Sequence, residues 1–219
     1  MTGMRSIALA GVFAVAGLPA HADMVSYFLD QSNVESAFPD LGATYLRVDI
    51  TDNYDASGDV RFDVTILDPR LLTGNSGIMR FGFNLAAGAT PITAVNILRP
   101  ANWGIATDAN VDGFGNFELV TDTTAPNRVS PTLTFFISGI AGDNRFSYVE
   151  LATNSDDTIP LQGSHYFAAQ VVAFNAVNGI TSGFFGGQTP AVVPLPASVW
   201  LLVSGLGLLA RVRNRRAVG

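Results

Sequence analysis

TYLRVDIT at residues 44–51 and DVRFDVTI at residues 59–66 are the two stretches that decide the fold. In each, an apolar side chain occupies every second position, which is the pattern of a strand with one buried face. Residues 52–58 between them are rich in Asp, Asn, Ser and Gly, which favour turns. Together the three segments predict a β-hairpin.

The same pattern continues through residues 23–187. Runs rich in Val, Ile, Phe, Tyr and Thr are bounded by Gly, Pro, Asn or Asp, and only residues 34–38 are a candidate for a short helix. Many short strands without alternating helices predict an all-β domain, an antiparallel β-sandwich or jelly roll. Nine strands are expected, at residues 25–29, 44–51, 59–66, 78–85, 93–98, 117–121, 132–138, 146–152 and 166–175.

The composition excludes several classes of functional site and partner. The 219 residues include no cysteine, which excludes a disulfide framework, a thiol nucleophile and a Cys-ligated metal. Residues 23–190 hold all 18 acidic residues but only seven of the twelve arginines, a formal charge of −11. Such a charge disfavours nucleic acid and other anionic partners, and it permits divalent cations.

The first 22 residues have the layout of a secretory signal peptide. Arg5 precedes an apolar stretch at residues 7–18, and Ala20 and Ala22 form the small-x-small site that signal peptidase needs. Cleavage there leaves Asp23 as the new N-terminus. We therefore expect residues 23–187 to be exported.

The C-terminal region predicts a membrane anchor. Residues 188–196 are a linker with a proline-rich motif, and residues 197–210 are uncharged and apolar around their whole circumference, as in a short transmembrane helix. Residues 211–219 then form a basic tail, and clustered arginines mark the cytoplasmic side. The motif residues are Val193, Pro194, Leu195, Pro196 and Ala197, and the tail arginines are Arg211, Arg213, Arg215 and Arg216.

A proline-containing tetrad, a short hydrophobic helix with Trp200 and Leu201 near its start, and a terminal arginine cluster together resemble the PEP-CTERM sorting signal. That signal occurs on exported proteins of Gram-negative bacteria that make exopolysaccharide, and Leu195 stands where the family usually has Glu. The resemblance implies transient anchoring in the inner membrane and recognition by an exosortase-type enzyme that cleaves near Pro194 to Ala197. It further implies delivery to the cell surface or the extracellular, biofilm-associated exopolysaccharide matrix.

The body also resembles a common passenger of that family, in GFGNF at residues 113–117 and HYFAA at residues 165–169. Most such passengers have no assigned activity. This second resemblance therefore implies a location and a fold, and no chemistry.

One stretch of the body matches the first half of a calcium loop. Asp108, Asn110 and Asp112 have the alternating oxygen ligands of such a loop, and Asn116 could contribute through water. The twelfth position is Leu119, where a bidentate Glu is required. A polar, Gly-rich connection between two strands is the alternative. A second acidic cluster, Asp49, Asp52, Asp55 and Asp59, is expected to be a solvated turn.

Two further residues bear on function. Trp103 lies in a loop-like stretch and is a candidate for stacking on a sugar, with burial in the core as the alternative. His165 is the one histidine left after signal cleavage, and the sequence has no nucleophile elbow, metalloprotease or P-loop motif.

The sequence thus predicts an exported structural or adhesive protein that is not an enzyme and needs no cofactor beyond possible calcium. The first alternative is a calcium-dependent carbohydrate-binding module, and the second is a secreted hydrolase.

Overall fold

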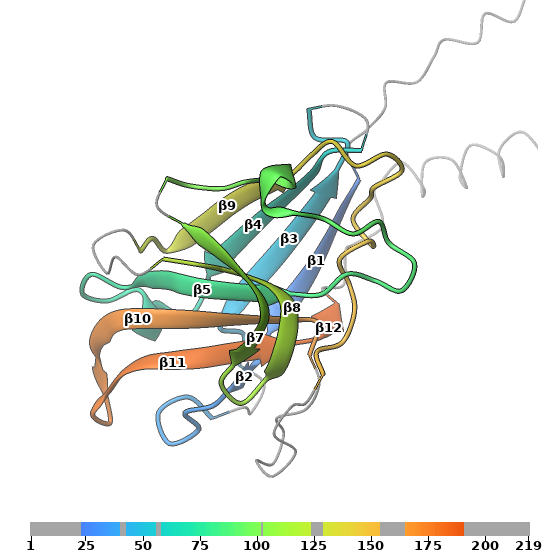
Figure 1. Ribbon diagram of the computed structural model, residues 1–219. Helices are drawn as coiled ribbons and strands as arrows, with labels where there is room; N and C mark the ends of the chain where they lie inside the picture. The colour runs from blue at the N-terminus through green and yellow to red at the C-terminus, as the bar shows by residue number, and fades with distance from the viewer. Residues whose placement is uncertain are drawn as a thin grey trace, which may run out of the picture.

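The computed structural model describes residues 23–39, 43–55, 58–101, 103–123, 129–153 and 165–190. Within them, two antiparallel sheets face each other, and the strands of one run at a steep angle to the strands of the other (Figure 1). The prediction of an all-β fold with antiparallel sheets is confirmed.

The first sheet has the strand order β12-β1-β3-β4-β9-β6 and the second the order β2-β11-β10-β5-β8-β7. The strands of the first sheet are β1 (Met24–Leu29), β3 (Leu46–Asp52), β4 (Val60–Ile66), β6 (Ile97–Leu98), β9 (Thr132–Ile137) and β12 (Thr189–Pro190). Those of the second are β2 (Gln31–Ser32), β5 (Gly77–Phe83), β7 (Gly104–Val111), β8 (Gly115–Asp122), β10 (Phe167–Val177) and β11 (Ile180–Gly187). Two short 3-10 helices are η1 (Pro69–Leu71) and η2 (Ala94–Asn96).

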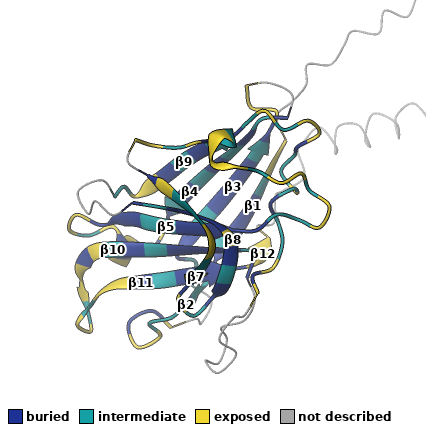
Figure 2. Cartoon of the chain, viewed as in Figure 1, coloured by how far each residue is buried: buried dark blue, intermediate teal, exposed yellow. Residues whose placement is uncertain are grey.

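The predicted hairpin is the centre of the first sheet. β3 and β4 pair in register from Leu46 opposite Ile66 to Asp52 opposite Val60. Their apolar positions are buried, and the alternate positions are partly exposed except for Asp49, as the colours of these strands show (Figure 2). The alternating pattern therefore predicted correctly which side chains of the hairpin face the core.

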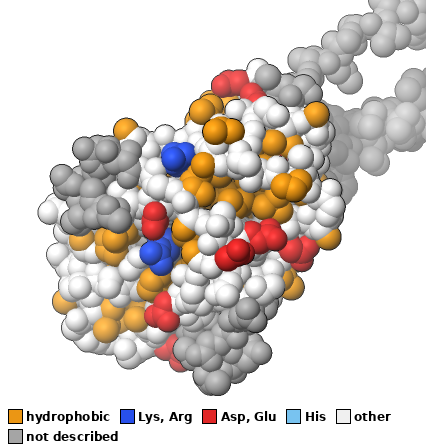
Figure 3. Space-filling view, in the orientation of Figure 1, with side chains coloured by type: hydrophobic (Ala, Val, Ile, Leu, Met, Phe, Trp, Pro, Cys, Tyr) orange, Lys and Arg blue, Asp and Glu red, His pale blue; other side chains and the backbone are white. Residues whose placement is uncertain are grey.

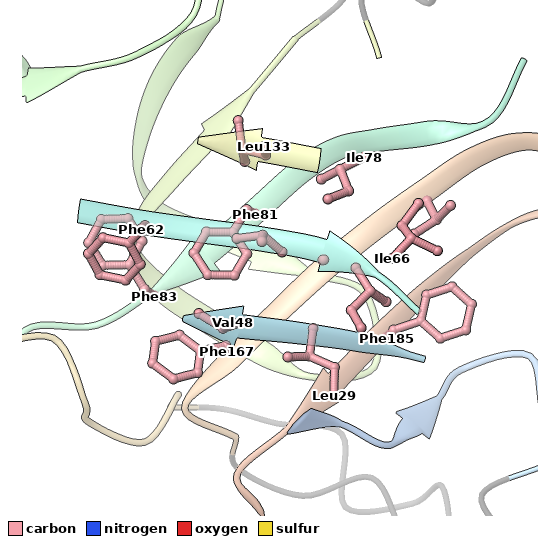
Figure 4. Packing of buried hydrophobic residues seen from close by; sticks show 14 of the residues in the cluster. Leu29, Val48, Phe62, Ile66, Ile78, Phe81, Phe83, Leu133, Phe167 and Phe185 are labelled. Atoms are coloured by element: carbon pink, nitrogen blue, oxygen red, sulfur yellow. The ribbon is translucent and has the colours of Figure 1, made fainter. Parts of the chain in front are cut away.

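Aromatic rings fill the space between the sheets (Figure 4). Phe62 of β4 stacks on Phe135 of β9 with ring centroids 4.6 Å apart, and Phe83 of β5 approaches Phe62 from the other sheet at 5.2 Å. All three side chains are 0–1% exposed. Burying one such ring stabilises the fold by roughly 1.5–3 kcal/mol, so these contacts dominate the energetics of the core.

The two sheets are joined at a corner where the chain changes sheet twice. β1 leads into β2 across Asp30, and β11 leads into β12 across Gln188, so that β12 pairs with β1 while β2 pairs with β11. A Cβ on Gly187 would lie 2.0 Å from the Phe28 carbonyl oxygen, so only glycine fits this crossing. The first and last strands of the domain are therefore neighbours.

Some strand predictions were wrong. Residues 146–152 form the end of a turn and an irregular segment rather than a strand. Residues 93–98 contain η2 and only a two-residue strand, and residues 34–38 form a single turn. β7 and β11 were not predicted as strands. Because β12 includes Thr189–Pro190, the sheets reach beyond residue 187, where the linker was expected to begin.

Candidate functional site

The residues that match half of a calcium loop lie on a β-hairpin. Asp108 and Asn110 belong to β7, Asp112 to the turn, and Asn116 to β8. A strand rises about 3.3 Å per residue, which separates Asp108 from Asp112 by roughly 13 Å along the chain. Calcium ligands all lie about 2.3–2.6 Å from one ion. The hairpin therefore does not bring these two carboxylates to one point.

The side chains of the set have other partners. Asn110 Nδ2 donates a hydrogen bond to Asn116 Oδ1 at 3.1 Å, and Asn33 Nδ2 donates one to Asp112 Oδ2 at 3.1 Å. In the part of the chain that the structure describes, no three His, Asp or Glu side chains are grouped to hold a metal ion. Of the predicted ligands, the structure brings together Asn110 and Asn116.

The β7–β8 hairpin forms one edge of the second sheet and curls over the outer face of the other strands of that sheet. Phe114 lies over Gly186 of β11, where a Cβ would come within 2.3 Å of the ring. Phe117 lies over Gly82 of β5, where a Cβ would come within 2.8 Å. Both rings are fully buried. They belong to a second apolar group, which we call the outer cluster: Val111, Phe114, Phe117, Val120, Ala152 and Ala168.

His165 lies beside the outer cluster and is 1% exposed. Its ring is perpendicular to that of Phe114, with centroids 5.0 Å apart, and its backbone carbonyl accepts a hydrogen bond from the Ala152 N–H. A side chain in this position packs against apolar groups, which is the structural role that a lone histidine commonly has.

Trp103 is 7% exposed and belongs to the core between the sheets. Its backbone carbonyl accepts a hydrogen bond from Arg99 Nε at 2.6 Å. A ring with so little exposed surface offers no face to a sugar. The expectation that Trp103 contacts a glycan is therefore corrected, and its alternative, burial in the core, holds.

A shallow cavity of about 440 Å³ lies between residues 85–92 and the β7–β8 hairpin, and a smaller one of about 210 Å³ adjoins it. Asp108 and Glu118 line both, and Glu150 lines the smaller. Figure 3 shows carboxylates beside apolar side chains on this face. Glu118 accepts from the Leu85 N–H at 2.9 Å, so at least one carboxylate holds the loop in place.

The acidic cluster of the first hairpin is only in part a solvated turn. Asp49 and Asp52 are 7% and 4% exposed. Asp49 forms an ion pair with Arg47 at 2.9 Å, and Asp52 forms one with Arg145 at 2.6 Å. The expectation of a solvated turn is therefore wrong for these two residues. No sequence pattern marks Arg145 as the partner of Asp52, because the two residues are 93 positions apart in the chain.

The predicted signal peptide and the predicted sorting motif, transmembrane helix and basic tail lie outside the described residues, except that Asp23 is described. Among the described residues there is no helix of the length and apolar character that crossing a membrane requires.

The fold and these surfaces define an all-β protein of two facing antiparallel sheets with a second apolar cluster on one outer face. Comparison of the chain with protein-family models, with curated proteins and with solved structures gives no match.

Proposed function

We propose that this chain is an exported, non-enzymatic structural or adhesive protein, sorted by a PEP-CTERM-like signal to the cell surface or the exopolysaccharide matrix. The observation that carries the proposal is the coincidence of three C-terminal features, the Val193–Pro196 tetrad, the apolar stretch at 197–210 and the arginine cluster after it. An exosortase-type enzyme is the partner that the tetrad implies.

The arrangement of the termini supports this proposal. The first strand, β1, pairs with the last, β12, with Tyr27 opposite Pro190 and Phe28 opposite Thr189. Cleavage before Asp23 and again near Pro194 would therefore leave both sheets whole. The burial of His165 supports a role other than hydrolysis.

Mass mapping of both ends of the protein, recovered from the medium and matrix of its own host, tests the proposal. We expect a species that begins at Asp23 and ends between Val193 and Ser198. Replacing both Pro194 and Pro196 by Ala should retain the full tail in the membrane fraction, whereas the control Thr189→Ala should be processed normally. A wild-type protein that keeps its tail in the inner membrane would contradict sorting.

A second candidate function, glycan binding, is favoured by an aromatic pair at the surface of the first sheet, the exposed Tyr54 and the half-buried Phe136. Tyr54 is 42% exposed and lies 5.6 Å from Phe136, and the Arg61 guanidinium lies 4.6 Å from the Tyr54 ring centre. Rings of this kind stack on the apolar faces of sugars. Arg61 also pairs with Asp63 at 2.6 Å, so the surface has balanced charge and suits a neutral polysaccharide.

Retention on the host's own exopolysaccharide, measured by affinity electrophoresis, tests this candidate. Tyr54→Ala should lower the retention several-fold, and the control Leu72→Ala, which truncates an apolar side chain that is 46% exposed, should not. Equal retention of both variants and the wild type would exclude the aromatic pair. Dependence on added calcium would support the calcium-dependent form of this candidate.

A further inference from the structure

The start of β1 is held tightly against the end of β3. The Asp23 N–H donates a hydrogen bond to Asp52 Oδ1 at 3.2 Å, and the Asp23 carbonyl accepts one from the Asp52 N–H at 3.0 Å. Asp23 is the residue that follows the predicted cleavage site. Its backbone nitrogen therefore has a fixed position, next to a carboxylate.

A loop from a distant part of the chain completes this site. Arg145 Nη1 lies 2.6 Å from Asp52 Oδ2 and 3.3 Å from Asp23 Oδ2. The loop is anchored by Tyr148, which is buried in the core and donates a hydrogen bond to Asp143. Burial, together with that hydrogen bond, raises the pKa of the Tyr148 hydroxyl, so it remains a donor.

The charges of this site do not balance. Two carboxylates share one guanidinium: the Asp23 side chain is 67% exposed and is solvated, whereas the Asp52 side chain is only 5% exposed. A buried carboxylate is costly unless cations and hydrogen bonds compensate it fully. Asp52 Oδ2 faces the Arg145 guanidinium, whereas Asp52 Oδ1 accepts from the uncharged Asp23 N–H, so a positive charge on that nitrogen would add a second cation beside the buried carboxylate.

We propose that signal-peptide cleavage creates this cation. Hydrolysis breaks the bond between the Ala22 carbonyl carbon and the Asp23 nitrogen. The carbon takes the hydroxyl of water, and the nitrogen takes the hydrogen and one solvent proton to become an ammonium. That ammonium forms at the atom 3.2 Å from Asp52 Oδ1, so a hydrogen bond from an uncharged amide to the carboxylate becomes an ion pair.

The consequence is that the processed chain is more stable than the same chain with its N-terminus extended. The charges at the start of β1 balance only after cleavage. Arg145 and the new N-terminus then together hold the start of β1 against the end of β3. This inference rests on the export part of the proposed function, because the cleavage site comes from the predicted signal peptide.

The absence of lysine makes the inference directly testable. The sequence has no Lys, so the α-amino group is the only primary amine of the processed protein. Acetylation with an amine-reactive ester removes its charge and keeps one N–H donor. Performed on the protein purified from its host, this change should lower the Tm by roughly 2–4 °C.

Asp52→Asn is the matched variant, because it removes the partner charge and keeps the side-chain shape. Acetylation should not lower its Tm further. If this variant does not fold, the rate of acetylation in wild type decides instead, since a paired amine should react several-fold more slowly in the native protein than in urea. Equal Tm values together with equal rates would overturn the inference.

A failure of the predicted export can be distinguished from a failure of the proposed ion pair. If mass mapping shows a terminus other than Asp23, the cleavage prediction fails before acetylation is attempted. If the terminus is Asp23 and acetylation changes neither Tm nor rate, export stands and the ion pair is rejected.

Discussion

The core between the sheets and the outer cluster are both built from phenylalanine, but they arise in different ways. In the core, Phe62 and Phe135 come from paired strands, each at a position that alternation marks as buried. In the outer cluster, Phe114 and Phe117 come from one hairpin and lie on Gly186 and Gly82 of other strands. The first depends on a local pattern and the second on gaps left by distant glycines.

This difference has an energetic consequence. A ring in the core contacts rings from both sheets, whereas the rings of the outer cluster lie over glycines and pack with the smaller apolar side chains of that cluster. We therefore expect the core to decide whether the chain folds. The outer cluster should decide whether the β7–β8 hairpin stays on the sheet.

The largest expected effect is in the core. Phe62→Ala removes a ring that packs against Phe135, Phe81, Phe83 and Tyr148, and should lower the free energy of unfolding by about 3–5 kcal/mol. Urea denaturation followed by circular dichroism measures this. A loss no larger than that of Phe114→Ala would break the distinction between the two regions.

The second-largest effect on stability is expected at Gly186, the glycine under the Phe114 ring. Gly186→Ala places a Cβ 2.3 Å from the Phe114 ring and should lower stability by about 1–3 kcal/mol. Hydrogen exchange should increase mainly in β7 and β8. In a Phe114→Ala background the same change should have little effect, because the space is then empty. Additive losses would show that Gly186 acts through something other than the ring.

A smaller, pH-dependent effect is expected near the core. Burial raises the pKa of Asp68, but hydrogen bonds from Arg70 and its charge outweigh this, so the pKa lies below the ordinary 3.8. A lowered native pKa stabilises the fold above the unfolded pKa, and this stabilisation is lost as the pH falls through the lowered value.

Asp68→Asn should therefore cost about 1 kcal/mol at pH 7. The difference between variant and wild type should disappear below the lowered pKa. Thermal melts from pH 7 to pH 2 measure it. A difference that persists unchanged at the lowest pH would assign the effect to side-chain shape instead of charge.

The smallest effect on stability is expected in the β7–β8 hairpin. Asp108 has a φ of +50°, a conformation that glycine adopts more easily. Asp108→Gly should therefore raise stability by about 0.5 kcal/mol, with or without calcium. A calcium-induced rise in the wild-type Tm that Asp108→Gly abolishes would instead support the calcium site predicted from the sequence.

The sequence predicted the central strands of the first sheet well, and it predicted the second sheet and the candidate site poorly. Alternation located β3, β4 and β9 because their side chains face one buried side. It did not locate β7, because the spacing of Asp108, Asn110 and Asp112 suggested metal ligands. The glycines on which the hairpin packs, Gly82 and Gly186, lie far away in the chain. Trp103 looked exposed because its neighbours are turn residues.

By itself, then, the amino-acid sequence determined the all-β class, the presence of the central hairpin and the acidic character of the body. These follow from side-chain period and composition, which are local properties. Only the tertiary structure decided that Phe114 is buried on Gly186, that Asp52 pairs with Arg145, and that the Asp23 nitrogen meets a buried carboxylate. Each of these contacts joins residues far apart in the chain, and no local pattern determines which distant residues will meet.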